Sequence, residues 1–447
     1  MTDAPSSGKT PSVDQGQSLA VGAPQRASRS TTRRALLRAA LAAGSITALS
    51  GLTKSASAQA TSDTGVGLKD WMTTPGRGTG SAPYGTPSRF EFEVVRRVTE
   101  HTPTPLSSWS FTPLDRLTGT ITPNGLVFER HHAGIPEIDP DHHRLAIHGL
   151  VERPLVLTMD DILRLPAVSQ IRFLECAGNG YTEVLNMPRS KTVQLSHGLL
   201  SSCEWTGVPL STLLGEVGVK SEAKWVLAEG ADASAMARSI PIEKALDDAL
   251  VVYAQNGEML RPEQGYPLRL LVPGCEGNLS IKWLRRLKLG VQPWHTRDET
   301  SKYTDLMPDG TVRQFTLVME AKSVITRPSG GHVLKARGFH EISGLAWSGR
   351  GRIARVDVST DGGRNWQRAR LDEPILPKAL TRFRLPWQWQ GAPALLKSRA
   401  TDETGYVQPT REQLIAVRGT NSEDHFNAIH TWRVDETGGV TNALIGS

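Results

Sequence analysis

Two kinds of hydrophobic pattern alternate along the middle of the chain, between Trp109 and about Asp298. Short apolar runs are typical of buried strands, and longer amphipathic runs are typical of helices. Strands are predicted at residues 145–150, 171–175, 225–229 and 268–272, and helices at residues 158–165, 210–217 and 242–249. Strands and helices mixed in this way predict one α+β domain, which we bound at residues 109–306.

After Met307 the helical pattern fades, and short strands with tight turns follow. Apolar residues alternate on both sides of Asp361-Gly-Gly, which predicts a hairpin over residues 353–371 with glycines at positive φ. Several short strands at this spacing predict an all-β sandwich of the immunoglobulin-like kind over residues 307–447. Such a domain also occurs in binding and adhesion proteins, so a non-catalytic binding protein is one alternative at this point.

The first 108 residues carry no pattern of a folded core. A twin-arginine run at Arg33-Arg34 precedes an apolar stretch, residues 39–52, and small-residue cleavage options at residues 56–60. This predicts a Tat export signal over residues 1–60, removed near Ala60, and a periplasmic protein. The apolar stretch is shorter than the ~20 residues that a membrane anchor needs. Residues 61–108, rich in Gly, Pro and Ser, predict an extended arm.

The basic character of the chain comes largely from this leader. The net charge is +6, but residues 1–60 carry seven basic and two acidic side chains, so the remaining chain has a charge of +1. We therefore expect neither a nucleic-acid nor a membrane-surface partner. A Tat signal exports folded proteins, a route suited to cofactors inserted in the cytoplasm.

Three cysteines are an odd number for an oxidising compartment, so at least one is a free thiol, an intermolecular partner or a ligand. Cys176 follows an apolar run and opens the glycine-rich turn Cys-Ala-Gly-Asn-Gly, which would present its thiolate to a partner. The alternative is a buried cysteine that acts only as a small hydrophobe. Cys203 and Cys275 are either core thiols or partners in a disulfide, because sequence does not show proximity.

An ordered series of motifs carries a family resemblance. It includes Phe-Glu-Arg-His-His at 128–132, Cys-Ala-Gly-Asn at 176–179, the segments 198–210 and 265–284, the hairpin around Trp347, and Val-Arg-Gly at 417–419. Across residues 109–435 the chain resembles the sulfite oxidase family of molybdopterin enzymes. Within that family, the run 198–210 preceded by His197, together with Cys203, resembles the molybdenum subunit of sulfane dehydrogenases. The resemblance implies a molybdopterin-binding domain followed by an immunoglobulin-like dimerisation domain.

The resemblance also implies a site built around a molybdenum-molybdopterin cofactor. Molybdenum accepts soft sulfur ligands, and Cys176 matches the protein thiolate. Catalytic roles are expected for Cys176, Arg130, Arg418 and Tyr303, with the two arginines holding anionic substrate oxygens. Gln264 stands where the family carries a histidine. The expected cofactor-binding residues are Phe128, Arg130, His131, His132, Cys176, Asp232, Gln264, Arg269, Ser280, Ile281 and Lys282.

One departure from the family bears on the substrate. Sulfite oxidases usually carry a second arginine five residues after the ligand cysteine, where this chain has Tyr181. Loss of a bidentate partner disfavours a small free dianion. The expectation is therefore oxidation of sulfane sulfur on a carrier protein, as in thiosulfate oxidation, with water as the oxygen source. The alternatives are a sulfite dehydrogenase using cytochrome c and, less favoured, a reductase of oxidised methionine.

Partners follow from the same resemblance. The chain has no Cys-x-x-Cys-His haem motif, so electrons would pass to a dihaem or other c-type cytochrome subunit. The C-terminal domain implies homodimers and an α2β2 heterotetramer. The histidines between His131 and His148 fit no particular zinc spacing, and an independent metal there is the minor alternative.

Overall fold

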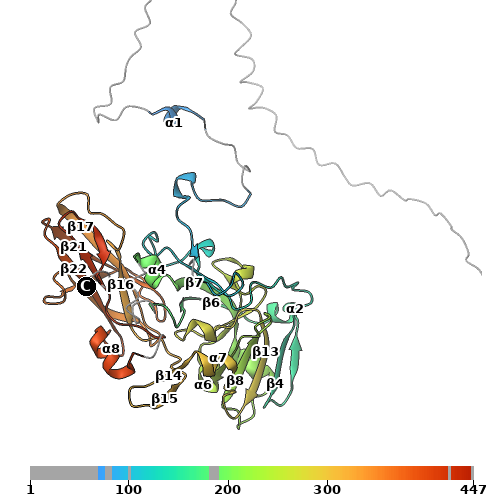
Figure 1. Cartoon of the computed structure of the whole chain (residues 1–447). Helices are drawn as coiled ribbons and strands as arrows, with labels where there is room; N and C mark the ends of the chain where they lie inside the picture. Colours follow the sequence, from blue (N-terminus) through green and yellow to red (C-terminus); the bar gives the residue numbers. More distant parts are fainter. Residues whose placement is uncertain (1–68, 76–82, 99–101, 181–190, 421–423, 444–447) are drawn as a thin grey trace, which may run out of the picture. The chain divides into compact units, whose positions relative to one another are not determined.

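The computed structural model describes residues 69–75, 83–98, 102–180, 191–420 and 424–443 (Figure 1). The predicted export signal and Tyr181 lie outside these described residues. The chain divides into two units, Met1–Gly85 and Thr86–Ser447. In the first unit the described residues form helix α1 (Asp70–Thr73). All other elements belong to the second unit. No helix in the described part of the chain is long and apolar enough to cross a membrane.

Two five-stranded sheets make up the α+β part of the second unit. The order of the first is β11-β10-β7-β6, with β12 also paired to β10, and the order of the second is β5-β4-β13-β8-β9. All pairings are antiparallel except that of β13 with β4. The strands are β4 (Leu145–Gly149), β5 (Leu155–Leu157), β6 (Val168–Glu175), β7 (Leu200–Pro209), β8 (Trp225–Gly230), β9 (Ala237–Pro241), β10 (Leu250–Gln255), β11 (Glu258–Met259), β12 (Arg269–Leu271) and β13 (Leu284–Gly290).

Short helices cover and connect these sheets. Helix α5 buries four apolar residues at helical spacing, Leu210, Leu213, Leu214 and Val217, in one core with β4, β8 and β13. The helices are α2 (Met159–Leu163), α4 (Val193–His197), α5 (Leu210–Val217), α6 (Ile242–Asp247) and α7 (Arg297–Ser301). Single 3₁₀ turns are η2 (Arg89–Glu91), η3 (Asn124–Leu126), η4 (Pro262–Gln264) and η5 (Gly277–Leu279). The predicted strands are confirmed as β4, β6, β8 and β12, and the predicted helices as α2, α5 and α6.

Part of the predicted arm is bound to this α+β part. Strands β1 (Arg97–Val98), β2 (Trp109–Phe111) and β3 (Glu129–Arg130) form a small antiparallel sheet. Arg96 pairs with Glu129, and the Gln194 side chain donates to the Val95 carbonyl at 2.9 Å. These contacts fix the start of the segment that carries Arg130.

The C-terminal part consists of two antiparallel sheets, in the orders β16-β17-β21-β20 and β19-β18-β22-β23-β24. The three fully buried aromatic residues Trp347, Phe383 and Trp432 centre one core between them. Helix α8 (Arg411–Arg418) follows β22, and the hairpin β14 (Thr304–Leu306) with β15 (Val312–Gln314) precedes this part. The strands are β16 (Lys322–Arg327), β17 (Gly338–Trp347), β18 (Ile353–Ser359), β19 (Gln367–Arg368), β20 (Arg370–Leu371), β21 (Thr381–Trp389), β22 (Ala394–Asp402), β23 (Thr431–Val434) and β24 (Val440–Asn442).

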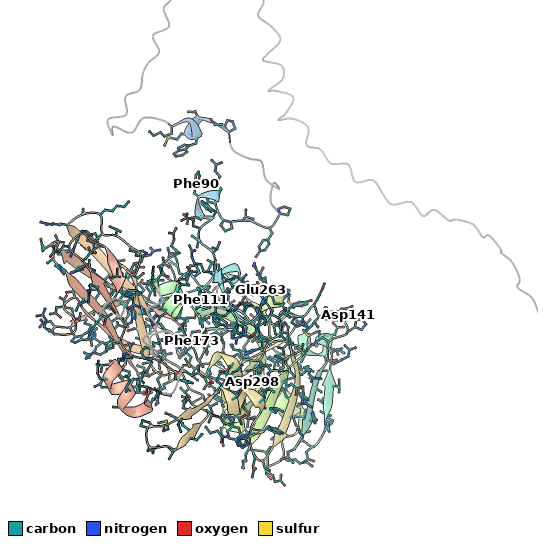
Figure 2. All side chains as sticks on the ribbon, in the orientation of Figure 1. Phe90, Phe111, Asp141, Phe173, Glu263 and Asp298 are labelled. Carbon is teal, nitrogen blue, oxygen red and sulfur yellow. The ribbon has the colours of Figure 1, made fainter. Side chains whose placement is uncertain are left out.

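The two parts share a core, and the predicted hairpin is confirmed. Phe173 of β6 is buried in the same cluster as the C-terminal tryptophans and lies between the two parts (Figure 2). Strands β18 and β19 pair antiparallel around Gly362 and Gly363, whose φ values are +80° and +99°. The fold is thus an α+β domain followed by a β-rich domain, and the cysteine loop lies at the junction of the two.

Candidate functional site

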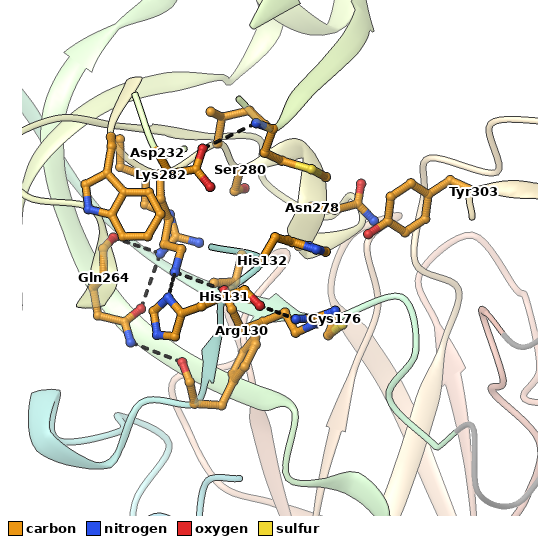
Figure 3. Close-up of a pocket in the computed structure, with 17 residues that line it drawn as sticks. Arg130, His131, His132, Cys176, Asp232, Gln264, Asn278, Ser280, Lys282 and Tyr303 are labelled. Atoms are coloured by element: carbon orange, nitrogen blue, oxygen red, sulfur yellow. Dashed lines mark hydrogen bonds between the residues drawn. The ribbon is translucent and has the colours of Figure 1, made fainter. Parts of the chain in front are cut away.

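A pocket opens between β3, the loop after β6, the turns η4 and η5, and Tyr303, which follows α7 by two residues (Figure 3). It gathers every cofactor-binding residue predicted from the sequence, and three of the four predicted catalytic residues. The lining residues are Phe128, Arg130, His131, His132, Leu174, Cys176, Asp232, Met236, Gln264, Arg269, Gly277, Asn278, Ser280, Ile281, Lys282, Trp283 and Tyr303. Residues far apart in sequence therefore converge on one cavity.

The half-buried side-chain amine of Lys282 organises the middle of the pocket. Lys282 Nζ donates to the carbonyl oxygens of Arg130 at 3.0 Å and Glu263 at 3.1 Å, and contacts His131 Nδ1 at 2.9 Å. The other ring nitrogen of His131, Nε2, is 2.8 Å from Glu129 Oε2. Burial, followed by the charge of the nearby Arg269, lowers the pKa of Lys282 well below its ordinary value. An anion bound here would stabilise the protonated amine.

Arg269 forms a second cationic position, deeper in the pocket. Its side chain is 3% exposed, and Nη1 donates to the Gln264 backbone oxygen at 3.0 Å and to its side-chain oxygen at 3.3 Å. Burial lowers the pKa of Arg269 to about 10. Among the described residues no carboxylate pairs with this guanidinium, and its Nε has no hydrogen-bond partner. A buried cation with an open donor fits a phosphate group, as the pterin cofactor requires.

Polar groups along the pocket wall fit the ring system of such a cofactor. Asp232 accepts hydrogen bonds from Ser234 Oγ at 2.5 Å and Met236 N at 3.3 Å, which aim its carboxylate. Gln264, which replaces a histidine of the family pattern, donates through Nε2 to the Phe128 carbonyl at 3.0 Å. Burial, with Arg130 and Lys302 nearby, lowers the pKa of His132 to about 4, so this ring stays neutral at pH 7.

Cys176 lies at the opposite end of the pocket, on the turn that ends β6. Its amide donates to the Leu199 carbonyl at 3.0 Å, and its carbonyl accepts from Asn179 N at 2.9 Å. Desolvation by the surrounding walls raises the pKa of the Cys176 thiol to about 11. A thiol in these surroundings becomes a thiolate at neutral pH when a metal ion supplies positive charge at the sulfur. The donor set therefore fits a metal that prefers sulfur.

Tyr303 is held by a buried arginine. The Arg238 guanidinium lies 4.4 Å from the centre of the tyrosine ring, and its Nη1 is 3.1 Å from Glu276 Oε2. Burial raises the pKa of Tyr303, so the hydroxyl stays protonated and acts as a donor. In Figure 3 the hydroxyl points toward Asn278.

Arg418 is placed differently from the other predicted catalytic residues. It ends α8, is 4% exposed, and does not line this pocket. Its Nη1 lies 3.4 Å from Asp305 Oδ2 and its Nη2 lies 3.6 Å from Glu320 Oε2. The structure thus brings Cys176, Arg130 and Tyr303 to one cavity and leaves the Arg418 guanidinium engaged by carboxylates.

The remaining histidines and cysteines have ordinary surroundings. His143 Nε2 lies 2.9 Å from the Leu284 carbonyl, and the exposed His142 pairs with Asp139 at 2.8 Å. In the described ranges no group of three or more His, Cys, Asp or Glu side chains could hold a metal ion. Cys203 and Cys275 are buried free thiols, so the alternative of a disulfide between them is wrong.

Sequence reasoning missed several residues around the pocket. Asn278 and Trp283 line it, and both fall within motifs that carried the family resemblance, so their positions could have been read from it. Arg238, Glu276 and His425 form a buried charged cluster beside Tyr303. No local pattern marks these three residues, because charged side chains are ordinarily read as exposed.

Comparison with known proteins gives this geometry a family. Residues 132–297 match the model of the oxidoreductase molybdopterin binding domain, and residues 313–431 match that of the Mo-co oxidoreductase dimerisation domain. Mitochondrial sulfite oxidase of Mus musculus is 34% identical over 317 residues, covering 65% of this chain and 58% of the relative. Sulfite oxidase of Gallus gallus is 32% identical, covering 65% of this chain and 68% of the relative.

One solved structure is more similar still. The crystal structure of the sulfane dehydrogenase SoxCD from Paracoccus pantotrophus aligns with a TM-score of 0.82 and 52% identity, covering 84% of this chain and 97% of that chain. The chain spans less than two thirds of the mouse enzyme, so its similarity is to that part. The two matched domains and these identities agree with a pocket whose basic residues suit molybdopterin. The chain belongs to the sulfite oxidase family of molybdopterin enzymes.

Proposed function

We propose that this protein is a periplasmic molybdenum oxidoreductase that oxidises sulfane sulfur bound to a cysteine of a carrier protein. The observation that carries the proposal is the 52% identity to the sulfane dehydrogenase SoxCD over 97% of that chain. The pocket with Cys176, Arg130 and Tyr303 supports it independently, because it combines a sulfur ligand with polar groups for an oxidised sulfur substrate.

In this proposal Arg269 and Lys282 hold the phosphate side of molybdopterin, and Asp232 accepts a hydrogen bond from the pterin. Phe128, His131, His132, Gln264, Ser280 and Ile281 line the remainder of the cofactor pocket. Cys176 supplies the protein thiolate to the metal. When bound, the molybdenum centre supplies two-electron oxidation, in which the substrate gains an oxygen atom derived from water.

The substrate groups are handled by side chains of this chain. Arg130, 5.2 Å from the Trp109 ring, places a permanent charge near Cys176 for sulfur-bound oxygens. Tyr303 donates a hydrogen bond from its protonated hydroxyl. Arg418 is proposed as the second substrate arginine, a role that requires it to leave Asp305 and Glu320.

Domain boundaries, export and partners complete the proposal. We propose an export signal over 1–60, an arm over 61–108, the cofactor domain over 109–306 and an immunoglobulin-like domain over 307–447. The last domain would mediate homodimers, in line with the dimerisation model that it matches. The three cysteines lie too far apart for a c-type haem motif in this chain, so a cytochrome c subunit would accept the electrons, giving an α2β2 assembly.

A sulfite dehydrogenase is the second candidate, because mitochondrial sulfite oxidases are up to 34% identical to this chain. The first test is the molybdenum and pterin content of the purified protein beside a Cys176→Ala variant. About one molybdenum per chain, with metal or activity lost in the variant, supports the cofactor assignment. Protein from a competent host without molybdenum refutes it. Faster turnover of free sulfite than of a thiosulfate-loaded carrier protein would favour the second candidate.

A further inference from the structure

The turn that carries Cys176 is held by a buried charged network from the C-terminal domain. Glu175, which directly precedes the cysteine, is fully buried. Its carboxylate accepts hydrogen bonds from Lys322 Nζ at 3.1 Å, Trp347 Nε1 at 2.6 Å and Asn179 Nδ2 at 2.9 Å. Lys322, which is 2% exposed, also donates to the Asn179 carbonyl at 2.8 Å. One ammonium group therefore ties together both sides of the turn.

Backbone contacts extend the same pattern along the chain. Phe173 N donates to the Lys378 carbonyl at 3.0 Å, and His425 N donates to the Ala177 carbonyl at 2.9 Å. Positions 173, 175, 177 and 179 are thus each bonded to a residue of the C-terminal domain. The metal-ligand turn has little freedom to move independently of that domain.

The buried charges of this network indicate that it provides a defined geometry rather than stability. A buried ion pair costs several kcal/mol of desolvation per ion and is often no more stabilising than an apolar pair of the same volume. What a fully satisfied buried network provides is one defined geometry. A metal ligand needs such definition, to within ~0.5 Å.

We propose that Lys322 is a positioning residue for Cys176, and that the C-terminal domain has a second role besides dimerisation, namely to fix the metal-ligand turn. The role of Cys176 as ligand rests on the proposed function, whereas the mechanical coupling of the turn to Lys322 does not. The two can therefore fail separately.

The test measures amide hydrogen exchange of residues 173–180 in the full-length purified protein, together with the molybdenum content and the Mo(V) paramagnetic resonance signal. Lys322→Gln leaves the buried Glu175 carboxylate without its cationic partner, with only the neutral donors Trp347 and Asn179. Exchange in the turn is expected to rise about tenfold or more, the ratio that corresponds to about 1.4 kcal/mol. The paramagnetic signal is expected to shift because the sulfur no longer has a single orientation.

Two further variants and a control separate positioning from general instability. Glu175→Gln with Lys322→Gln replaces the ion pair by a neutral amide pair and is expected to restore the protection of the turn. Trp347→Phe removes one hydrogen-bond donor to Glu175 and is expected to raise amide exchange in the turn by a smaller factor. It provides the test by itself should Lys322→Gln fail to fold. Leu396→Ala, in the fully buried β22 core, is expected to lower the melting temperature without altering the turn.

The proposal is overturned if exchange in the turn is the same in Lys322→Gln and Leu396→Ala, or if Trp347→Phe leaves it unchanged. A variant with a loosened turn, in a protein whose Cys176→Ala form keeps both its molybdenum and its activity, would confirm the coupling and refute the ligand assignment instead.

Discussion

The buried cluster of Arg238, Glu276 and His425 makes a sharp prediction about stability. The Glu276 carboxylate is 3.1 Å from Arg238 Nη1 and 2.7 Å from His425 Nε2, and all three side chains are under 5% exposed. Burial alone would raise the pKa of Glu276, but His425 and Arg238 outweigh it and lower the pKa to about 2. The perturbation is Glu276→Gln, which keeps the shape and removes the charge.

The magnitude follows from two routes. A pKa of about 2 against the ordinary 4.5 corresponds to about 3 kcal/mol of stabilisation by the ionised form. Removing one partner of a buried pair costs about 3–5 kcal/mol. Glu276→Gln should therefore destabilise the fold by about 3 kcal/mol at pH 7, which lowers the melting temperature of the unit Thr86–Ser447 by about 4 °C.

The stabilisation by Glu276 depends on pH in a defined direction. Because the folded-state pKa of Glu276 is depressed, its contribution is fully present above the ordinary pKa and is lost as the pH falls from about 4.5 toward 2. Calorimetric melting of both proteins between pH 7 and pH 3.5 should show a constant gap that shrinks below pH 4.5. Equal melting temperatures at pH 7, or a gap that widens in acid, would refute this account of the cluster.

Three further predictions concern the pocket and its turn. Arg269→Gln removes a buried cation that no carboxylate balances among the described residues. The pterin content of the purified variant, measured by fluorescence after release from the protein, should fall about tenfold. The melting temperature of the cofactor-free variant should not drop. Gly277→Ala places a Cβ 2.7 Å from the Glu175 carbonyl oxygen and should lower the free energy of unfolding, measured by calorimetry, by about 1–3 kcal/mol. The control Gly215→Ala in α5, with open space around its Cβ, should not destabilise the protein. Alkylation of the folded, cofactor-free protein should label Cys176 and spare the buried Cys203 and Cys275. If mass spectrometry finds Cys203 or Cys275 labelled before Cys176, the burial of these two thiols is contradicted.

The elements that could be predicted from sequence are those whose pattern is local. Helix α5 and the strands β4, β6 and β8 carry continuous or periodic apolar residues, and that periodicity alone determines which face is buried. The hairpin after β18 was equally accessible, because Gly362 and Gly363 supply the positive φ values that its turn requires. For the pocket, the family resemblance supplied residues that periodicity could not.

The charged groups behind the cysteine turn could not be predicted, for a physical reason. Lys322 and Glu175 are 147 positions apart, and Arg238 and Glu276 are 38 positions apart. Each looks like a surface residue until its partner is known, since burial of an ion is affordable only in a specific pair. Arg418 is a further example. The sequence motif around it was recognisable, but its pairing with Asp305 and Glu320 could not be predicted.

The distribution of charge explains why the two domains act as one site. At the cofactor end, Arg269 is buried and Lys282 is half-buried, and no described carboxylate forms an ion pair with either, which leaves both side chains to an anionic ligand. At the other end of the pocket, burial is the largest cause that raises the pKa of the Cys176 thiol, and the charges of Asp424 and of the adjoining Glu175 raise it further. Lys322 brings a positive charge from the second domain to the Glu175 carboxylate. The second domain therefore balances the charge of the buried carboxylate that precedes Cys176, an effect that acts within one chain and needs no second subunit.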